Sequence, residues 1–154
     1  MLNALSIILH LLAINVWVGG TFFTVVILPH AAASLEPAER HPFMRIVLKR
    51  FFFWVWLAMM ILISTGGWMI YRVFGGIINA PLYVVLMMSI TLLMVCVFLL
   101  IYFGSYRLYV QSLKQENLSD SERHLDYISL LSKINMALGI CVVLVIGGGP
   151  HFLL

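Results

Sequence analysis

Residues 82–103 read LYVVLMMSITLLMVCVFLLIYF and contain no charged side chain. A helix needs about 20 apolar residues to cross the hydrocarbon core of a bilayer. Comparable apolar stretches cover residues 5–28, 51–71 and 134–150. The whole chain of 154 residues is 63% hydrophobic and 10% charged, with a mean hydropathy of +1.07. Soluble domains are roughly half apolar and about a quarter charged. We therefore predict an all-α membrane protein, in which residues 1–154 form a single bundle of four transmembrane helices.

The lysines and arginines indicate how the bundle is oriented. All of them except Arg72 lie in two segments, between the first and second stretches and between the third and fourth. The positive-inside rule places such segments in the cytoplasm, so both termini are expected on the periplasmic side. The first stretch is longer than a signal-peptide core, and we expect it to be retained. The net charge of +3 thus reports topology and does not indicate nucleic-acid binding.

Local signals suggest where the fourth helix begins and ends. Ser119 followed by Glu122 is typical of a capping box. Glycines at 147–149 followed by Pro150 predict the end of the helix. His41 and His124 lie in the basic segments and are expected to be solvated.

His10 is the most informative polar residue, because ionisable groups inside membrane spans are usually functional. By helical periodicity Ala13, Trp17 and Thr21 share its face. Small and polar faces turn toward neighbouring helices rather than lipid. His10 is therefore predicted to point into the bundle, either as a ligand or as a structural histidine with a hydrogen-bond partner.

Other candidate ligands lie toward the same side of the membrane. His151 follows the glycines of the fourth stretch, and Met69, Met87 and Met88 lie at depths compatible with His10. Imidazole with thioether suits Cu(I), and Cys96 would add a further soft donor. Histidine with histidine or methionine also suits haem iron. The alternative is that the methionines are ordinary core residues.

Two classes of protein are disfavoured. No acidic or basic residue lies securely within an apolar stretch, which argues against a proton pump or an ion-coupled transporter. The sequence contains no nucleophile motif, P-loop or HExxH motif.

Short motifs along nearly the whole chain resemble the CopD-like and HemJ-like families of four-helix bacterial membrane proteins. They are LHLLAINVWVGG (9–20) followed by His30, LKRFF (48–52), Thr65-Gly66, LYVVLMM (82–88) and Lys133-Ile-Asn135.

The two families imply different functions. CopD-like proteins are associated with copper uptake or resistance in the bacterial inner membrane. HemJ-like proteins are haem b proteins that act as protoporphyrinogen oxidases, and their first-helix histidine, here His10, is thought to bind the haem. Val85 and Cys96 replace a lysine and a histidine of the HemJ pattern, which argues against protoporphyrinogen oxidation in this protein.

The resemblance leads us to expect an inner-membrane haem b protein with a redox or electron-transfer role. His10, Trp17, Gly20 and Thr21 would surround the cofactor, and the second ligand would be His151 or one of the three methionines. Quinol or a periplasmic carrier would then be the redox partner. A copper-binding or copper-importing protein is the first alternative. A cofactor-free subunit of a larger membrane complex is the second, and a homodimer is compatible with each.

Overall fold

The computed structural model describes residues 2–152, except the side chains of residues 2, 3, 37 and 150–152. Four long helical segments account for nearly all of this part of the chain, and each is long and apolar enough to cross a membrane. The first comprises α1 (Leu2–Ile14), η1 (Asn15–Gly19), α2 (Gly20–Phe22), η2 (Phe23–Ile27) and α3 (Leu28–Ala32). The second is α4 (Pro37–Phe74), followed by the short turn η3 (Ile77–Asn79). The third comprises α5 (Leu82–Leu99), η4 (Leu100–Tyr106) and α6 (Arg107–Lys114), and the fourth is α7 (Leu118–Phe152). The predicted four-helix membrane fold is confirmed.

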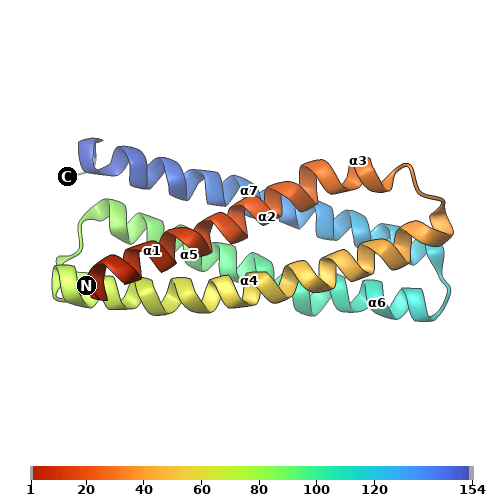
Figure 1. Cartoon of the computed structure of the whole chain (residues 1–154), viewed down its shortest axis with the longest axis horizontal. Helices are drawn as coiled ribbons and strands as arrows, with labels where there is room; N and C mark the ends of the chain where they lie inside the picture. Colours follow the sequence, from red (N-terminus) through yellow and green to blue (C-terminus); the bar gives the residue numbers. More distant parts are fainter. Residues whose placement is uncertain (1, 153–154) are drawn as a thin grey trace.

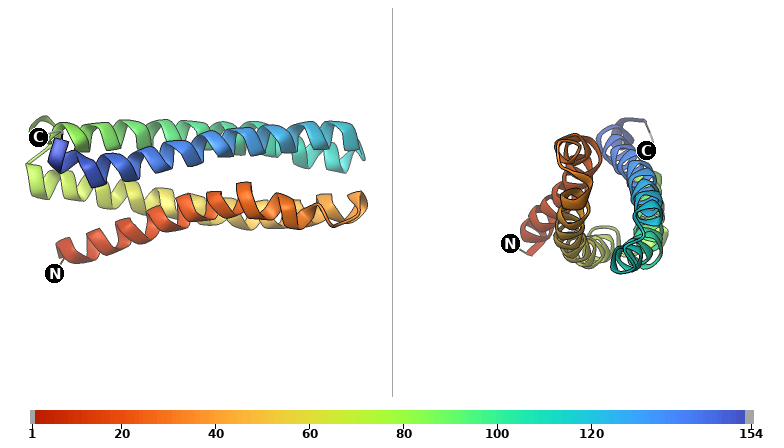
Figure 2. Two further views of the ribbon diagram at one scale, coloured as in Figure 1. Left: turned by 90° about the horizontal axis from the view of Figure 1, so that it is seen from above. Right: turned by 90° about the vertical axis from the view of Figure 1, so that its right-hand side faces the viewer.

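The segments form two antiparallel hairpins (Figure 1). One hairpin joins α1–α3 to α4, the other joins α5–α6 to α7, and Figure 2 shows them as two layers. Both termini and η3 lie at one end of the bundle. The α3–α4 and α6–α7 connections lie at the other, which we call the basic end because all lysines and arginines except Arg72 lie in its half. That the termini face the periplasm remains a prediction of the positive-inside rule.

The ends of α7 differ from the sequence-based expectation. Asn117, rather than Ser119, caps the helix, because its Oδ1 accepts a hydrogen bond from the Asp120 amide at 3.1 Å. The helix also continues through the glycines to Phe152. A helix satisfies its own backbone groups, and lipid offers them no other partner. Gly149 contributes a close approach as well, since a Cβ there would lie 2.4 Å from Cβ of Tyr83 on α5.

Wide π-helical turns keep one face of the first segment inward. Its buried residues Ala13, Trp17, Thr21 and Val25 follow one another at intervals of four. In a regular α-helix this spacing would rotate by about 40° at each step. The π turns η1 and η2 compensate for that drift, and such turns are frequent at functional sites. The predicted inward face of the first segment is thus confirmed.

An aromatic cluster joins the two hairpins at mid-bundle. Phe52 of α4 packs against Phe98, Tyr102 and Tyr106 of the second hairpin, with ring centroids 5.8, 6.0 and 4.9 Å away. Trp17 meets the edge of the Phe98 ring at 6.1 Å. The outer faces of the helices carry many exposed leucine, isoleucine, valine and phenylalanine side chains, as expected of surfaces that contact lipid.

Candidate metal-binding cavity

A cavity of about 310 Å³ lies between the hairpins, in the half of the bundle that holds the termini. Its walls come from α1, η1, α4, α5 and α7 and are mostly aliphatic. The side chains with ligand or aromatic chemistry on these walls are His10, Trp17, Met87, Met88 and Met94. The structure therefore brings together four residues that the sequence singled out separately: His10, Trp17 and the adjacent methionines of α5.

The hydrogen bonds around His10 are compatible with a metal-binding tautomer. Its Nδ1 lies 2.8 Å from the Thr65 hydroxyl, which donates its single hydrogen to the Ile61 carbonyl at 2.6 Å. With that hydrogen on the Ile61 carbonyl, Nδ1–H of neutral His10 donates to Thr65 Oγ1. Nε2 then keeps its lone pair, and none of the described residues hydrogen-bonds to it. An imidazole held in one tautomer by its second nitrogen is the usual form of a metal-binding histidine.

Two glycines of α4 shape the wall beside this histidine. Gly66 and Gly67 both line the cavity. A Cβ at Gly66 would lie 3.4 Å from Cε1 of His10, so the imidazole sits close against the α4 backbone. The sequence shows that residues 64–67 are small or polar. It does not show that Thr65 of this stretch hydrogen-bonds to His10, which lies 55 residues away.

The other predicted site residues lie elsewhere. Gly20 packs against the ring of Phe51, where a Cβ would come within 2.8 Å. Thr21 is buried and donates to the Trp17 carbonyl at 2.7 Å, but does not line the cavity. Met69 is half-buried on α4 outside the lining. His151 lies in the last turn of α7, where its side chain is outside the described part.

Cys96 is exposed on the outer surface of α5 and does not line the cavity, so it does not join a soft-ligand path there. Among the side chains that the structure describes, which exclude that of His151, no group of three or more histidine, cysteine or acidic residues could hold a metal. Any metal in the cavity would therefore depend on one imidazole together with thioethers.

Comparison with known proteins gives one match. Residues 45–148 match the copper resistance protein D family, and this region covers most of α4, all of α5–α6 and most of α7. His10 and Trp17 precede it. No curated protein and no solved structure gives a significant match. Nothing in these comparisons supports the HemJ-like part of the resemblance. Because the matched region spans more than half of the chain, the protein belongs to the copper resistance protein D family.

Proposed function

We propose that this protein binds Cu(I) in the cavity beside His10 and handles copper at the bacterial inner membrane. The ligands are Nε2 of His10 and the thioethers of Met87 and Met88. The observation that supports this best is that all three side chains line one cavity in a protein of this family. Soft thioether ligands favour Cu(I), and imidazole also binds copper.

The charge balance favours copper as cargo rather than as a resident cofactor. All three ligands are neutral, and no carboxylate lines the cavity. A monovalent ion would thus keep its charge in apolar surroundings, which is costly. The aromatic wall of Trp17 offsets part of that cost by a cation–π interaction. Sites that pass an ion onward need such moderate affinity, since the ion must also leave.

The test is an anaerobic Cu(I) titration of the detergent-purified protein against a competing chelator. We expect one ion per chain and an X-ray absorption spectrum with mixed nitrogen and sulfur ligation. Met87→Leu and Met88→Leu should each weaken binding. Met60→Leu is the matched control, because Met60 is 60% exposed on the outer face of α4. Failure to take up Cu(I), or equal affinity in all three variants, would reject the proposal.

Haem b is a second candidate for the same cavity. The volume of about 310 Å³ is far larger than one ion requires, and Gly67 leaves open space on the α4 wall, since an added Cβ there would meet nothing within 4 Å. His10 would hold the haem together with Met87 or Met88, and the haem would supply one-electron chemistry with quinol or a periplasmic carrier. An optical spectrum of dithionite-reduced protein from haem-supplied cells decides this. Sharp α and β bands would show that the protein binds haem, and a featureless visible region would exclude haem binding. Absence of both copper and haem would leave the accessory-subunit interpretation.

Thr65→Val should weaken Cu(I) binding by about 10–100-fold, the usual cost of losing a group that orients a metal-binding histidine. Valine preserves the shape of the side chain but cannot accept the Nδ1–H bond of His10. Thr91→Val is the control, since Thr91 lines the same cavity but donates only to the Met87 carbonyl of its own helix. The chelator titration measures both, and equal affinities would contradict the assigned role of Thr65.

A further inference from the structure

Asn15 is a carboxamide that the fold directs outward, near the middle of the first membrane span. It is the first residue of η1 and is exposed, whereas Trp17 in the same turn is buried. The span runs from Ala4 to Ala32, so at about 1.5 Å per residue Asn15 lies at least about 16 Å from either end. The hydrocarbon core of a bilayer is about 30 Å thick and contains no water. Asn15 therefore meets lipid chains at a depth where they offer it no hydrogen bond.

Most of the hydrogen-bonding capacity of Asn15 has no partner in the described part of the chain. One Nδ2 hydrogen is donated to the Leu11 carbonyl at 2.9 Å, which leaves the second hydrogen and both lone pairs of Oδ1. The exposed hydroxyls of Ser64 and Ser89 differ, because each donates its single hydrogen to a carbonyl of its own helix. Asn135 is buried between α5 and α7, out of reach of another chain. Asn15 thus needs an outside partner that offers both a donor and an acceptor.

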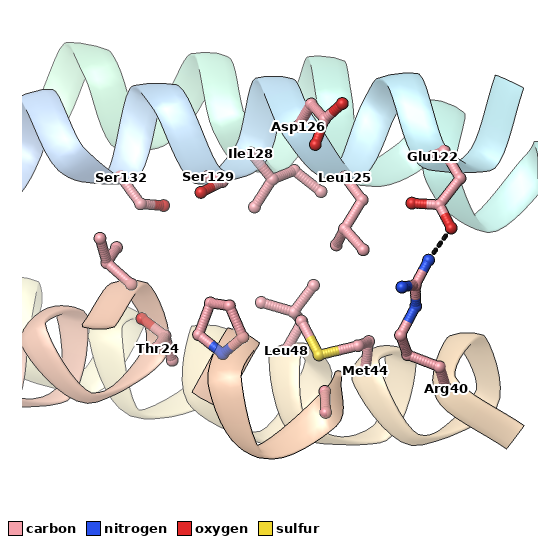
Figure 3. A pocket seen from close by; sticks show the side chains of 13 residues that line it. Thr24, Arg40, Met44, Leu48, Glu122, Leu125, Asp126, Ile128, Ser129 and Ser132 are labelled. Carbon is pink, nitrogen blue, oxygen red and sulfur yellow. Dashed lines mark hydrogen bonds and ion pairs between the residues drawn. The ribbon is translucent and has the colours of Figure 1, made fainter. Parts of the chain in front are cut away.

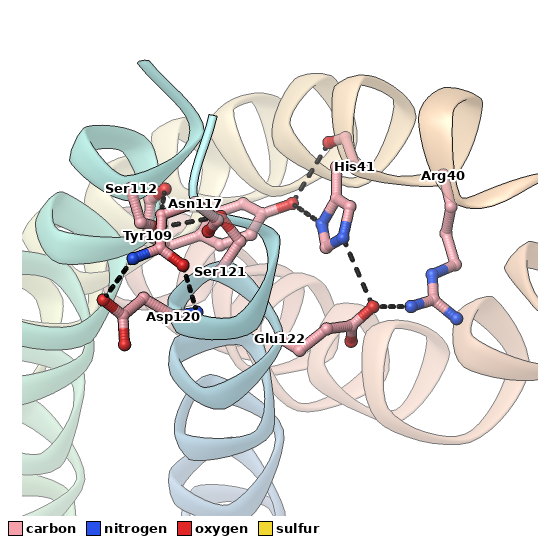
Figure 4. Close-up of polar contacts among 8 residues, drawn as sticks. All are labelled: Arg40, His41, Tyr109, Ser112, Asn117, Asp120, Ser121 and Glu122. Atoms are coloured by element: carbon pink, nitrogen blue, oxygen red, sulfur yellow. Dashed lines mark hydrogen bonds and ion pairs between the residues drawn. The ribbon is translucent and has the colours of Figure 1, made fainter. Parts of the chain in front are cut away.

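Polar side chains toward the basic end have partners or access to water instead. Arg40 of α4 pairs with Glu122 of α7, and Nε2 of His41 lies 3.2 Å from the same carboxylate oxygen (Figure 4). The hydroxyls of Ser129 and Ser132 line a second cavity, of about 190 Å³, between the hairpins (Figure 3). That volume is large enough to hold water. Neither arrangement directs an unpaired group at lipid, as happens at Asn15.

Gly19 gives the same side of the helix room for a close neighbour. It is the last residue of η1, one turn from Asn15, and is also exposed. A Cβ at Gly19 would meet nothing within 4 Å, whereas one at Gly20 would come within 2.8 Å of the Phe51 ring. Packing within this chain therefore requires Gly20 but does not require Gly19. Small residues on the outer side of a transmembrane helix let a second helix approach closely.

Large apolar side chains extend this surface in both directions along the helix. We call the surface the Asn15 face, and it comprises the exposed residues Ile8, Leu12, Asn15, Gly19, Phe22 and Phe23.

We propose that the Asn15 face is the interface of a homodimer, in which the first helical segments of two copies pack about a two-fold axis along the membrane normal. A carboxamide is self-complementary, so Nδ2–H of each Asn15 donates to Oδ1 of the other and both use groups that the monomer leaves free. Because lysines and arginines concentrate at one end, every copy inserts in the same orientation. Identical residues then lie at equal depth, and a two-fold contact brings Asn15 to Asn15. The dimer does not depend on what the His10 cavity binds.

Dilution in lipid tests the role of Asn15. Energy transfer between donor-labelled and acceptor-labelled copies, measured in vesicles over a range of protein-to-lipid ratios, gives the dissociation constant of the dimer. Asn15→Leu should weaken the dimer at least about 5-fold, the size expected for losing interhelical hydrogen bonds in a bilayer. Asn15→Gln keeps the carboxamide and should retain most of the affinity. Ser64→Ala is the control and should match the wild type, because Ser64 is exposed but bonds within its own helix. A monomeric wild type at every ratio, or an Asn15→Leu protein that dimerises as well as the wild type, overturns the proposal.

A bulky side chain at position 19 tests the close approach of the helices. Gly19→Leu should weaken the dimer at least about 5-fold without disturbing the monomer, since the position faces open space. Gly147→Leu is the matched control, because Gly147 of α7 is also exposed with nothing within 4 Å of an added Cβ. Equal dissociation constants for the two variants would contradict the interface.

Cross-linking locates the contact on the surface. In a Cys96→Ser/Cys141→Ser background, which removes the two exposed native thiols, Leu12→Cys should give a covalent dimer with a short bifunctional thiol reagent in vesicles. Leu93→Cys should stay monomeric, since Leu93 is similarly exposed but lies on α5, away from the Asn15 face (51% against 57% for Leu12). Equal cross-linking at both positions, or none at position 12, overturns the proposed interface. A cross-link from position 12 to a different protein in native membranes, with the purified chain monomeric, would replace the homodimer by a mixed complex.

Discussion

His10→Gln is expected to lower the Cu(I) affinity by more than about 100-fold. Even residues that merely orient a ligand cost about 10–100-fold when they are lost, and here the ligand itself is removed. Glutamine can still donate an amide hydrogen toward Thr65, so the hydrogen-bonding role of the side chain has a substitute. Chelator competition measures the affinity, and thermal unfolding in detergent shows whether the fold persists.

His30→Gln is the matched control for this prediction. His30 lies on the same helical segment but is exposed near the basic end, where Nδ1 contacts the Val26 carbonyl at 2.7 Å. Its replacement should leave Cu(I) affinity unchanged. Similar losses in both variants would show that copper binds nonspecifically to surface imidazoles. An unaffected His10→Gln protein would move the site away from the cavity altogether.

The architecture follows from the sequence because a bilayer constrains it strongly. Long uncharged stretches fix the number of helices, and short connections make neighbours antiparallel. The inward side of the first helix was also predictable, because Ala13 and Thr21 are smaller or more polar than the surrounding leucines and isoleucines. The residues that share its helical face were therefore enough to assign His10 to the bundle interior.

On the third helix, helical periodicity does not show which side faces the bundle. Its residues are apolar on every face, so nothing separates the side that packs from the side that contacts lipid. Sequence reasoning thus offered Cys96 as a further soft donor, whereas it is exposed outside the cavity, and could not distinguish Met87 from Met69 as cavity residues. The same limitation applies to the helix ends, where Gly147 does not stop a helix in lipid as it would in water.

Contacts between distant residues were equally inaccessible to sequence analysis. His41 was expected to be solvated, yet it is 2% exposed beneath the Arg40–Glu122 pair. Glu122 lies 82 residues from Arg40, and no local pattern links them. The unpaired oxygen of Asn135 likewise becomes visible only when α5 is packed against α7.

Phe52→Ala is expected to reduce the free energy of unfolding by about 2–4 kcal/mol. Phe52 is 1% exposed and fills the centre of the aromatic cluster. In soluble proteins such a truncation costs about 3–5 kcal/mol, part of which is transfer of the side chain to water. Helices that separate within a bilayer stay in lipid, so that part largely disappears here. The cavity and the lost aromatic contacts remain, since aromatic pairs contribute about 0.5–1.5 kcal/mol each beyond area burial.

Unfolding titrated with SDS in mixed micelles measures this loss, with Phe53→Ala as the matched control. Phe53 is adjacent in sequence but 65% exposed on the lipid face, and its truncation should stay within about 0.5 kcal/mol. Comparable effects at both positions would mean that the aromatic cluster does not hold the hairpins together. If only Phe52→Ala lowers the free energy of unfolding, the contacts at the centre of the bundle contribute most to holding the hairpins together.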